Sequence, residues 1–507
     1  MEGMKRDIST SSTTSLWLAE GPRRDYPVLE EDLSCQVLVI GGGITGVSAA
    51  YELLEAGFDV VLLEKDRLAS KASGNTTGKL TLQHSFAYQE LLKTGKTDAA
   101  RDLLDSQQEA LERFRQITAT NDWACDRMDA RAVLYGRTEA EARIVKREAR
   151  AYDELGIPYD KIYTEFEKGI GLAVKDQIGF NAAKYVYAMA EYLDNNGVRL
   201  FEYSQAGGSL DKVTDGYRIK VNGDVTITCQ YVIIASGYPA IDGGANFSFR
   251  LNPSRSLALA YQYDDTEESM YISAEAPYRS VRYSRGEKNY LIIVGGSHRV
   301  ASKSSVRELQ DEMKAWARKH FGVKEPAYAW AAQDYFTPDG LPYIGRLSDD
   351  EEHRNVFVAT GFRKWGLGFG IWSGMYFRRL IVSETEEIET FKVTRDSLTA
   401  IALSQAKDKL GVLIDTLTEP GQVRELDDIG FNDGGIVEIA GKRQGVWVDG
   451  DGNRRFVSTS CTHMGCGLKW NDLEQSYDCP CHGSRFTREG FVIEGPAAAD
   501  LKHPEEK

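Results

Sequence analysis

The sequence predicts an α/β domain, a region of β-strands associated with it, and a small all-β domain at the C-terminus. Three observations lead to this prediction. An apolar run at 35–40 is followed by a glycine-rich turn, a helical pattern and a second apolar run at 59–64. Residues 251–300 have strand-like patterns, and short strand-like segments after residue 421 enclose two loops rich in cysteine and histidine.

The composition is that of a globular protein with two or three domains. The chain has 507 residues, and 76 acidic against 61 basic side chains give a formal charge of −15. This charge disfavours nucleic acid and anionic membranes as partners. No apolar run approaches the roughly 20 residues of a membrane span, and the N-terminus lacks the apolar core of a signal peptide. We therefore expect a cytoplasmic protein, with its oligomeric state undetermined.

The first element of the α/β domain is a strand followed by a glycine-rich turn. Residues 1–30 read as a polar arm, which Trp17 and Leu18 could anchor to the body. Gly41, Gly43 and Gly46 then follow the strand in the spacing of a dinucleotide-binding turn, and Glu64 ends the second strand, where its carboxylate can accept ribose hydroxyls. The turn alone does not separate FAD from NAD, and a glycine-rich packing turn is the alternative.

The remaining elements follow from periodicity and breaker residues. Asn222-Gly223 marks a hairpin, and a strand at 356–359 leads through glycines 366, 368 and 370 into a helix ending at about Leu380. These glycines would let backbone amides and a helix N-terminus approach a cofactor. Further expected helices are 88–120, 139–155, 181–195 and 306–320, and further strands are 257–263 and 290–294. Residues 384–420 are expected to form a helical connector.

Four segments resemble the D-amino-acid oxidase and glycine oxidase family: VLVIGGGITG with Glu64, the loop ASGNTTGKL, the strand YVIIASGYP, and TPDGLPYIG followed by ATGF. The resemblance covers roughly residues 33–383 and implies a Rossmann-like FAD domain interleaved with an antiparallel substrate domain, over 31–383. It also implies tightly bound FAD and hydride transfer from a carbon beside an amine. The implied cofactor-binding residues, besides the three fingerprint glycines and Glu64, are Ser73, Thr77, Gly78, Gly361 and Gly366.

The most specific signal is the pair of loops CTHMGC and CPCHGS between residues 461 and 484. Cys461 and Cys479 offer two thiolates, and His463 and His482 offer two imidazoles, which is the ligand set of a Rieske [2Fe–2S] centre. Tetrahedral zinc would accept the same four ligands. Zinc, however, does not require Cys466, Cys481 or the residues Pro480 and Gly483 that bend the second loop.

Both loops resemble those of Rieske proteins in respiratory and photosynthetic cytochrome complexes. The resemblance makes 421–507 a Rieske domain and implies a disulfide between Cys466 and Cys481. It assigns to Ser484 a hydrogen bond to a bridging sulfide. Phe486 stands where high-potential members carry tyrosine, so we expect one fewer hydrogen bond to sulfur and a lower potential.

Substrate residues are less well specified. In amino-acid oxidising relatives an arginine three residues before TPDG pairs the substrate carboxylate, and Asp334 stands at that position here. An acid can pair an ammonium instead, so Asp334 is a candidate for binding a cationic amine, with a capping acid as the alternative. Arg363 and Lys364 are candidate partners for an anion. His84 could face the flavin or be attached to it.

The two halves together predict an FAD-dependent dehydrogenase for amines or amino-acid-like substrates. A flavin takes two electrons as a hydride, whereas a [2Fe–2S] cluster takes one at a time, so the cluster would relay electrons singly to an unidentified acceptor. Three alternatives stay open: an oxygen-using oxidase with the cluster as redox sensor, a reductase running in the opposite direction, and a non-catalytic electron carrier.

Overall fold

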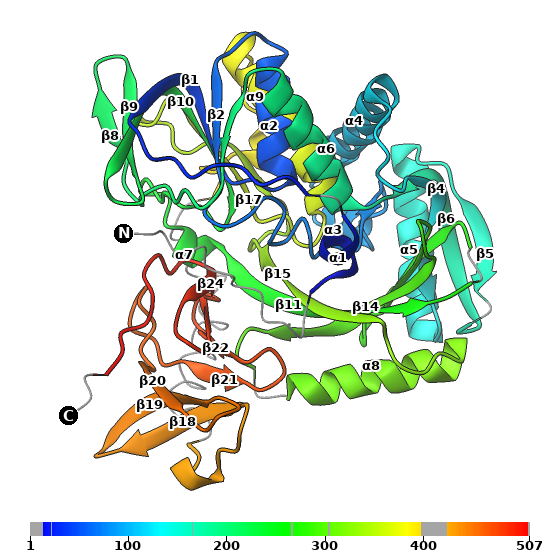
Figure 1. Cartoon of the computed structure of the whole chain (residues 1–507). Helices are drawn as coiled ribbons and strands as arrows, with labels where there is room; N and C mark the ends of the chain where they lie inside the picture. The colour runs from blue at the N-terminus through cyan, green and yellow to red at the C-terminus, as the bar shows by residue number, and fades with distance from the viewer. Residues whose placement is uncertain are drawn as a thin grey trace.

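The computed structural model describes residues 14–21, 23–164, 166–264, 267–302, 305–396 and 423–504. It contains two large sheets with helices packed against them and a smaller C-terminal domain of β-strands (Figure 1). Among the described residues no helix is both long and apolar enough to cross a membrane.

The first sheet has parallel strands at its centre, as expected for the nucleotide-binding domain. Strand β1 lies between β2 and β10 and pairs with both in parallel. The strand order is β16-β17-β10-β1-β2-β7, with β9 on β10 and β8 on β9. The strands are β1 (Leu33–Ile40), β2 (Val60–Leu63), β7 (Arg199–Phe201), β8 (Asp211–Val213), β9 (Gly216–Val221), β10 (Val225–Gly237), β16 (Tyr343–Arg346) and β17 (Val356–Thr360).

Helices α2 (Ile44–Leu54), α6 (Ala182–Asn195) and α9 (Gly366–Val382) lie together beside this sheet (Figure 1). A Cβ added to Gly374 of α9 would lie 2.6 Å from the Ser48 carbonyl carbon of α2, so the two helices pack backbone to backbone. The hairpin predicted at Asn222-Gly223 is confirmed: both residues have positive φ, at 52° and 90°, and β9 and β10 pair antiparallel around them.

The second sheet runs in the order β15-β11-β14-β13-β12-β4-β6-β3, with β5 on β6. It was expected to be antiparallel, but β4 and β12 pair in parallel, because a strand pattern carries no information on the direction of a distant partner. The strands are β3 (Lys79–Leu80), β4 (Met128–Gly136), β5 (Asp160–Thr164), β6 (Gly169–Gly179), β11 (Asn252–Gln262), β12 (Ser269–Ser273), β13 (Ser280–Ser284), β14 (Tyr290–Arg299) and β15 (Tyr328–Phe336).

Four more α-helices flank this region. Helix α8 lies along the second sheet on the side away from the first sheet (Figure 1). The four are α3 (Ala87–Lys93), α4 (Thr97–Asn121), α5 (Glu139–Leu155) and α8 (Val306–Phe321), so the helical pattern at 88–120 is two helices with a break. A short helix α7 (Phe247–Arg250) precedes β11.

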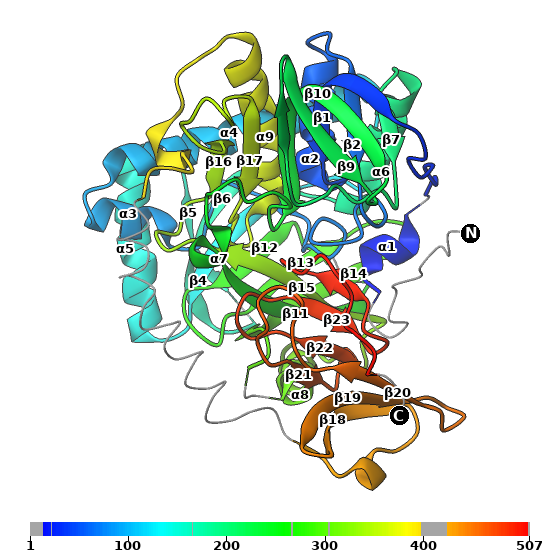
Figure 2. The same ribbon diagram turned by 90° about the vertical axis from the view of Figure 1, so that its left-hand side faces the viewer.

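The C-terminal domain contains two small antiparallel sheets and lies beside β11 and β15 (Figure 2). Its elements are the 3₁₀ turn η2 (Leu426–Asp428) and the strands β18 (Asp433–Ile439), β19 (Lys442–Val448), β20 (Arg454–Ser458), β21 (Lys469–Asn471), β22 (Ser476–Asp478), β23 (Arg485–Thr487) and β24 (Val492–Glu494).

The N-terminal arm and the helical connector, both predicted from the sequence, differ in outcome. The N-terminal arm is anchored as expected, since helix α1 (Leu16–Glu20) buries Trp17 to 1% exposure. Of the expected helical connector, residues 397–420 lie outside the described part of the chain. Its described part, 384–396, contains only the 3₁₀ turn η1 (Glu389–Phe391).

Candidate functional site

The turn between β1 and α2 has no room for side chains at its glycines. Gly41 has φ +116°, and a Cβ there would lie 2.5 Å from the Ala235 carbonyl oxygen. A Cβ on Gly46 would lie 1.8 Å from the Gly41 carbonyl oxygen. Both positions therefore require glycine, for the tight turn and for helix-on-strand packing, in the roles that the fingerprint assigns to them.

The loop that was expected to wrap the cofactor meets the N-terminus of α2. The Ser73 hydroxyl accepts a hydrogen bond from the backbone N–H of Ile44 at 2.9 Å, and a Cβ on Gly43 would lie 2.9 Å from the same oxygen. Gly43 has no side chain, so the Ser73 hydroxyl and the backbone of the α2 N-terminus, which carries a partial positive charge, lie close together here. Such a cradle fits a pyrophosphate.

Glu64 lies at the end of β2, beside this turn. Its carboxylate accepts hydrogen bonds from the backbone N–H groups of Gly42 at 2.8 Å and Asp66 at 2.9 Å. Burial raises its pKa above the ordinary value, although both hydrogen bonds oppose this shift. Each carboxylate oxygen keeps accepting capacity, which fits a ribose that presents hydroxyls here.

The loop at 72–78 is held from two sides, by the N-terminal arm that Trp17 was expected to anchor and by Arg282, which the sequence did not single out. On one side, the Trp17 indole N–H donates to the Thr76 carbonyl at 2.6 Å, and Ser15 bonds the Gly74 carbonyl. On the other, the buried Arg282 guanidinium donates to the Thr77 carbonyl at 2.7 Å and to the Gly78 carbonyl. Thr77 and Gly78 therefore contribute backbone oxygens to an internal contact.

The second turn of the site precedes α9. Gly361 has φ +74°, and Arg363 and Lys364 are both left-handed, with φ 51° and 72°. Gly366 opens α9 after this turn, which we call the flavin-edge turn (residues 361–365) after the flavin that the family resemblance leads us to expect there. Gly368 and Gly370 do not leave open backbone as expected. A Cβ on Gly368 would meet the Gln107 side chain, and one on Gly370 would lie 2.8 Å from Ile44 Cγ2 of α2.

Asp334 on β15 holds this turn. Its carboxylate accepts the Tyr335 backbone N–H at 2.9 Å and a hydrogen bond from the backbone of Lys364. Desolvation raises the pKa of Asp334 to about 6, against the lowering effect of those hydrogen bonds and of the Lys364 ammonium. Asp334 therefore positions the flavin-edge turn, a role similar to that of the capping acid given as the alternative from the sequence.

Arg363 belongs to the same turn, and His84 packs against it through Trp365. Within the described residues the half-buried Arg363 guanidinium makes no hydrogen bond or ion pair, and its nearest aromatic contact is Phe336, with the ring centroid 5.9 Å away. His84 stacks on Trp365 with ring centroids 4.4 Å apart, and burial lowers its pKa to about 3. His84 is therefore a neutral packing residue beneath the turn.

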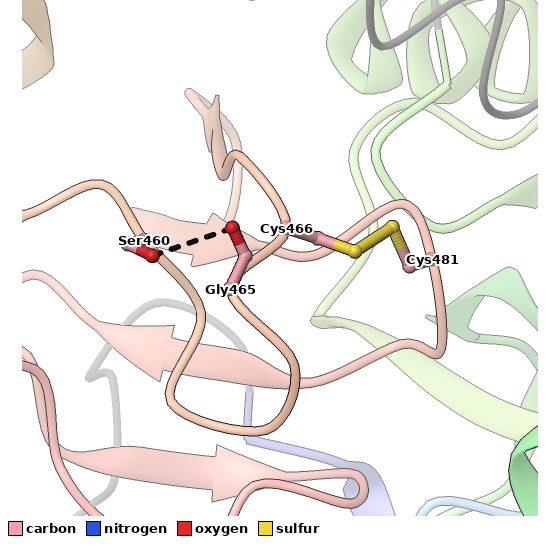
Figure 3. The surroundings of a disulfide bond; sticks show 4 residues. All are labelled: Ser460, Gly465, Cys466 and Cys481. Atoms are coloured by element: carbon pink, nitrogen blue, oxygen red, sulfur yellow. Dashed lines mark hydrogen bonds between the residues drawn. A yellow bond between two sulfur atoms is a disulfide. The ribbon is translucent and has the colours of Figure 1, made fainter.

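The two C-terminal loops come together around a compact set of sulfur and nitrogen atoms. Cys466 and Cys481 form a disulfide, as the Rieske resemblance implied, and it joins the two loops (Figure 3). The Ser460 hydroxyl donates to the Gly465 carbonyl at 3.3 Å and closes the first loop (Figure 3). His463 and His482 have ring centroids 5.1 Å apart.

The two remaining loop cysteines are buried and lie within hydrogen-bonding reach of each other. The pKa of Cys461 is lowered to about 6, mainly by Cys479, and the Ser484 hydroxyl contributes to the same shift. Ser484 also accepts the Ala497 backbone N–H at 3.1 Å, so its own proton is directed to sulfur. The same contact with Cys461, together with burial, raises the pKa of Cys479. Two adjacent cysteine side chains and two imidazoles whose rings face each other fit a cluster with one iron on sulfur and one on nitrogen.

Comparison with known families agrees with both halves. Residues 36–380 match the family of FAD dependent oxidoreductases that includes DAO. The chain belongs to this family. Residues 421–505 of this FAD-dependent oxidoreductase match the Rieske [2Fe-2S] domain, so its cofactors are FAD and a Rieske-type cluster.

The chain is also similar to three individual proteins. The Bacillus subtilis Rieske 2Fe-2S iron-sulfur protein YhfW is 32% identical over 96% of both chains. The gamma-glutamylputrescine oxidoreductase of Escherichia coli is 24% identical and covers 75% of this chain and 92% of its own. The crystal structure of glycine oxidase from Geobacillus kaustophilus superimposes with a TM-score of 0.60 at 19% identity, covering 72% of this chain and 99% of that one.

Proposed function

We propose that this oxidoreductase oxidises an amine or amino-acid-like substrate at the C–H bond next to nitrogen, and that the electrons leave singly through the Rieske cluster. The observation that carries the proposal is the position of β15. This strand holds the flavin-edge turn through Asp334 and contacts the second cluster loop through the adjacent Gln333. Residues of both cofactor sites therefore converge on two consecutive positions.

The chain's own residues supply binding and orientation. Gly41, Gly43 and the α2 N-terminus would hold the FAD pyrophosphate, Ser73 would border it, and Glu64 would hold the ribose. Bound FAD supplies the hydride acceptor. Cys461, Cys479, His463 and His482 would hold the cluster, with Cys466–Cys481 fixing the two loops.

Arg363 and Asp334 are the proposed substrate residues. The Arg363 guanidinium is half-buried and forms no direct ion pair among the described residues, which supports a role in binding an anionic group of the substrate. Asp334 is ionised above a pH of about 6 and would place negative charge near a cationic nitrogen. Loss of the amine proton and of a hydride from the neighbouring carbon leaves an imine.

The names of two similar proteins support a substrate of this class. One is an oxidoreductase named for gamma-glutamylputrescine, an amine, and the fold is shared with a glycine oxidase. Both names describe nitrogen-containing substrates.

Anaerobic mixing of the holoprotein with a panel of amines and amino acids tests the proposal, with flavin and cluster absorption followed together. We expect at least one compound to bleach the flavin and then the cluster. Asp334→Asn should slow bleaching, whereas Asp349→Asn, a change at an exposed acid, should not. If no compound bleaches the flavin, the proposal is wrong. Stoichiometric peroxide that persists in Cys461→Ser would identify an oxygen-using oxidase instead.

A further inference from the structure

The two faces of the β11–β15 strand pair serve different partners. Opposed residues of antiparallel strands share a face. Ser254 pairs with Asp334, and this face is directed at the flavin-edge turn. The neighbouring pairs, Pro253 with Tyr335 and Arg255 with Gln333, lie on the other face.

That second face contacts the cluster loop directly. Gln333 Nε2 donates to the carbonyl oxygen of Gly483 at 2.8 Å and to the Tyr335 hydroxyl at 2.9 Å. Gly483 stands between His482 and Ser484, with φ +78°. A Cβ there would lie 2.5 Å from Pro253 Cβ, so the loop reaches the strand pair only because this residue is glycine.

The orientation of the Gln333 amide is fixed by its neighbour. Arg255 Nη1 lies 3.5 Å from Gln333 Oε1, so the oxygen of the amide faces the guanidinium and the nitrogen faces Gly483. Tyr335 in turn accepts the Arg363 backbone N–H at 3.1 Å through its carbonyl. Hydrogen bonds at the two ends of Tyr335, joined by the covalent bonds of that residue, thus link the flavin-edge turn to the loop that carries His482.

A buried ion cluster holds the Rieske domain in this orientation. Arg255, with 2% exposure, pairs with Glu474 at 2.5 Å and with Glu494 at 2.6 Å. Arg485 of the Rieske domain pairs with the same two acids at 2.8 Å and 3.0 Å. The acids are thus shared between an arginine of each domain. Buried charge pairs of this kind are more effective at specifying geometry than at adding stability.

We infer that the Rieske domain receives electrons from a fixed dock on the β11–β15 face, and that Gln333 is the positioning residue that joins this face to the cluster loop. The inference rests on the proposed direction of electron flow. Oxidation of one substrate releases two electrons, whereas the cluster iron accepts one, going from ferric to ferrous. Two electrons therefore pass across this contact one at a time in each turnover. A one-electron acceptor outside the chain reoxidises the cluster after each transfer.

Gln333→Leu tests the inference, because it removes the hydrogen bonds of the amide with Gly483, Tyr335 and Arg255 with little change in volume. The matched control is Gln262→Leu, at an exposed position on the same strand pair. With a substrate that bleaches the flavin, we expect wild-type flavin bleaching in both variants. In Gln333→Leu alone, the rate of cluster reduction should fall roughly tenfold. This is the factor that corresponds to losing the one hydrogen bond between Gln333 and the cluster loop. The EPR spectrum and midpoint potential of its cluster should stay unchanged.

Two further measurements separate a fixed dock from a swinging domain. Cluster reduction in the wild type should not depend on solvent viscosity, and amides of 479–484 should exchange hydrogen faster in Gln333→Leu than in the control. The inference is wrong if Gln333→Leu reduces its cluster at the wild-type rate. It is also wrong if the rate of cluster reduction in the wild type falls as solvent viscosity rises.

Photoreduction of the flavin replaces the substrate as the electron source and keeps the two proposals distinguishable. If light reduces the flavin and then the cluster with the same dependence on Gln333, the dock is correct even where every amine fails. If amines bleach the flavin while the cluster is reduced equally fast in both variants, the proposed function stands and the inferred role of Gln333 is wrong.

Discussion

The Glu64 carboxylate accepts a hydrogen bond from the Gly42 backbone N–H at 2.8 Å, and this bond ties the end of β2 to the glycine turn after β1. Glu64→Ala would remove the bond together with the acceptor proposed for the ribose. We expect FAD affinity to fall by about 10–100-fold, since a hydrogen bond to a charged group contributes about 1.5–3 kcal/mol. Fluorescence titration of the apoprotein measures it, with the exposed Glu31→Ala as control. Unchanged affinity would contradict a cofactor role for Glu64.

Asp334 should give the reaction a pH dependence centred near 6. The carboxyl group is neutral below its pKa of about 6 and ionised above it. Only the ionised form accepts both backbone N–H groups and offers charge to a cation, so flavin reduction should rise with pH through about 6. Asp334→Asn should lack this limb in a stopped-flow pH profile. If the variant keeps the limb, another group is responsible.

The raised pKa of Asp334 also determines how this residue's contribution to the free energy of unfolding changes with pH. The folded-state pKa of Asp334 lies above the unfolded value, so this group favours the folded state most at low pH. That contribution is lost as pH rises from about 4 to about 6. Asp334→Asn should therefore be no less stable than wild type at pH 7, measured by urea denaturation, and relatively less stable at pH 4. A variant destabilised equally at both pH values would contradict the shift.

Loss of the Cys466–Cys481 disulfide should destabilise the Rieske domain. The two cysteines are 15 residues apart, a separation for which closing the loop contributes about 3 kcal/mol in the chain-entropy account. Replacing both by serine should lower the unfolding temperature of this domain and speed cluster loss, followed by the cluster absorbance. Cys125→Ala, at a buried free thiol of the other domain, should leave cluster retention unchanged.

Arg485 is expected to be the most sensitive single position of the Rieske domain. Its side chain is 5% exposed and pairs with Glu474, Asp478 and Glu494. Arg485→Met takes a counter-ion from two buried acids, Glu474 and Asp478, and from the half-buried Glu494, so we expect a loss of about 3–5 kcal/mol in denaturant unfolding. Arg454→Met, at an exposed arginine, should cost at most about 1 kcal/mol. Similar costs for both variants would show that the ion cluster does not support the domain.

Phe486→Tyr should raise the midpoint potential of the cluster. Phe486 is fully buried in the core beneath the cluster loops, where a hydroxyl on its ring could donate to sulfur. Such a bond stabilises the more negative reduced cluster. An EPR-monitored redox titration checks the shift, with Phe456→Tyr on β20 as control. A potential that stays at the wild-type value would remove Phe486 as the cause of a low potential.

Local sequence predicted those parts of the site whose residues are near neighbours in the chain. Gly41, Gly43 and Gly46 lie within one turn, and each cluster loop supplies its cysteine and histidine within four positions. The spacing alone therefore carries most of the geometry. The role of the glycines after β17 was harder to predict. A glycine that allows close helix packing and a glycine that leaves the backbone open to a cofactor look the same in the sequence.

The contacts between domains had no local signal. Arg255, Gln333 and Glu494 belong to three strands that are far apart in the sequence, and each residue looks like an ordinary solvated side chain in its own segment. Only the register of β11 with β15, and the approach of the Rieske domain to that face, bring them together. Arg282 was missed for the same reason, and Trp17 was expected to anchor the arm but not to contact the cofactor loop.

The pairing of Pro253 with Tyr335 and of Arg255 with Gln333 has a consequence for evolution by gene fusion and fission. These four side chains form a surface whose charge and shape are complementary to a Rieske loop, and in this chain the domain that covers them is covalently attached. An oxidase that retained the four residues without a Rieske domain of its own would expose a ready docking site. A separate Rieske subunit would be its natural partner.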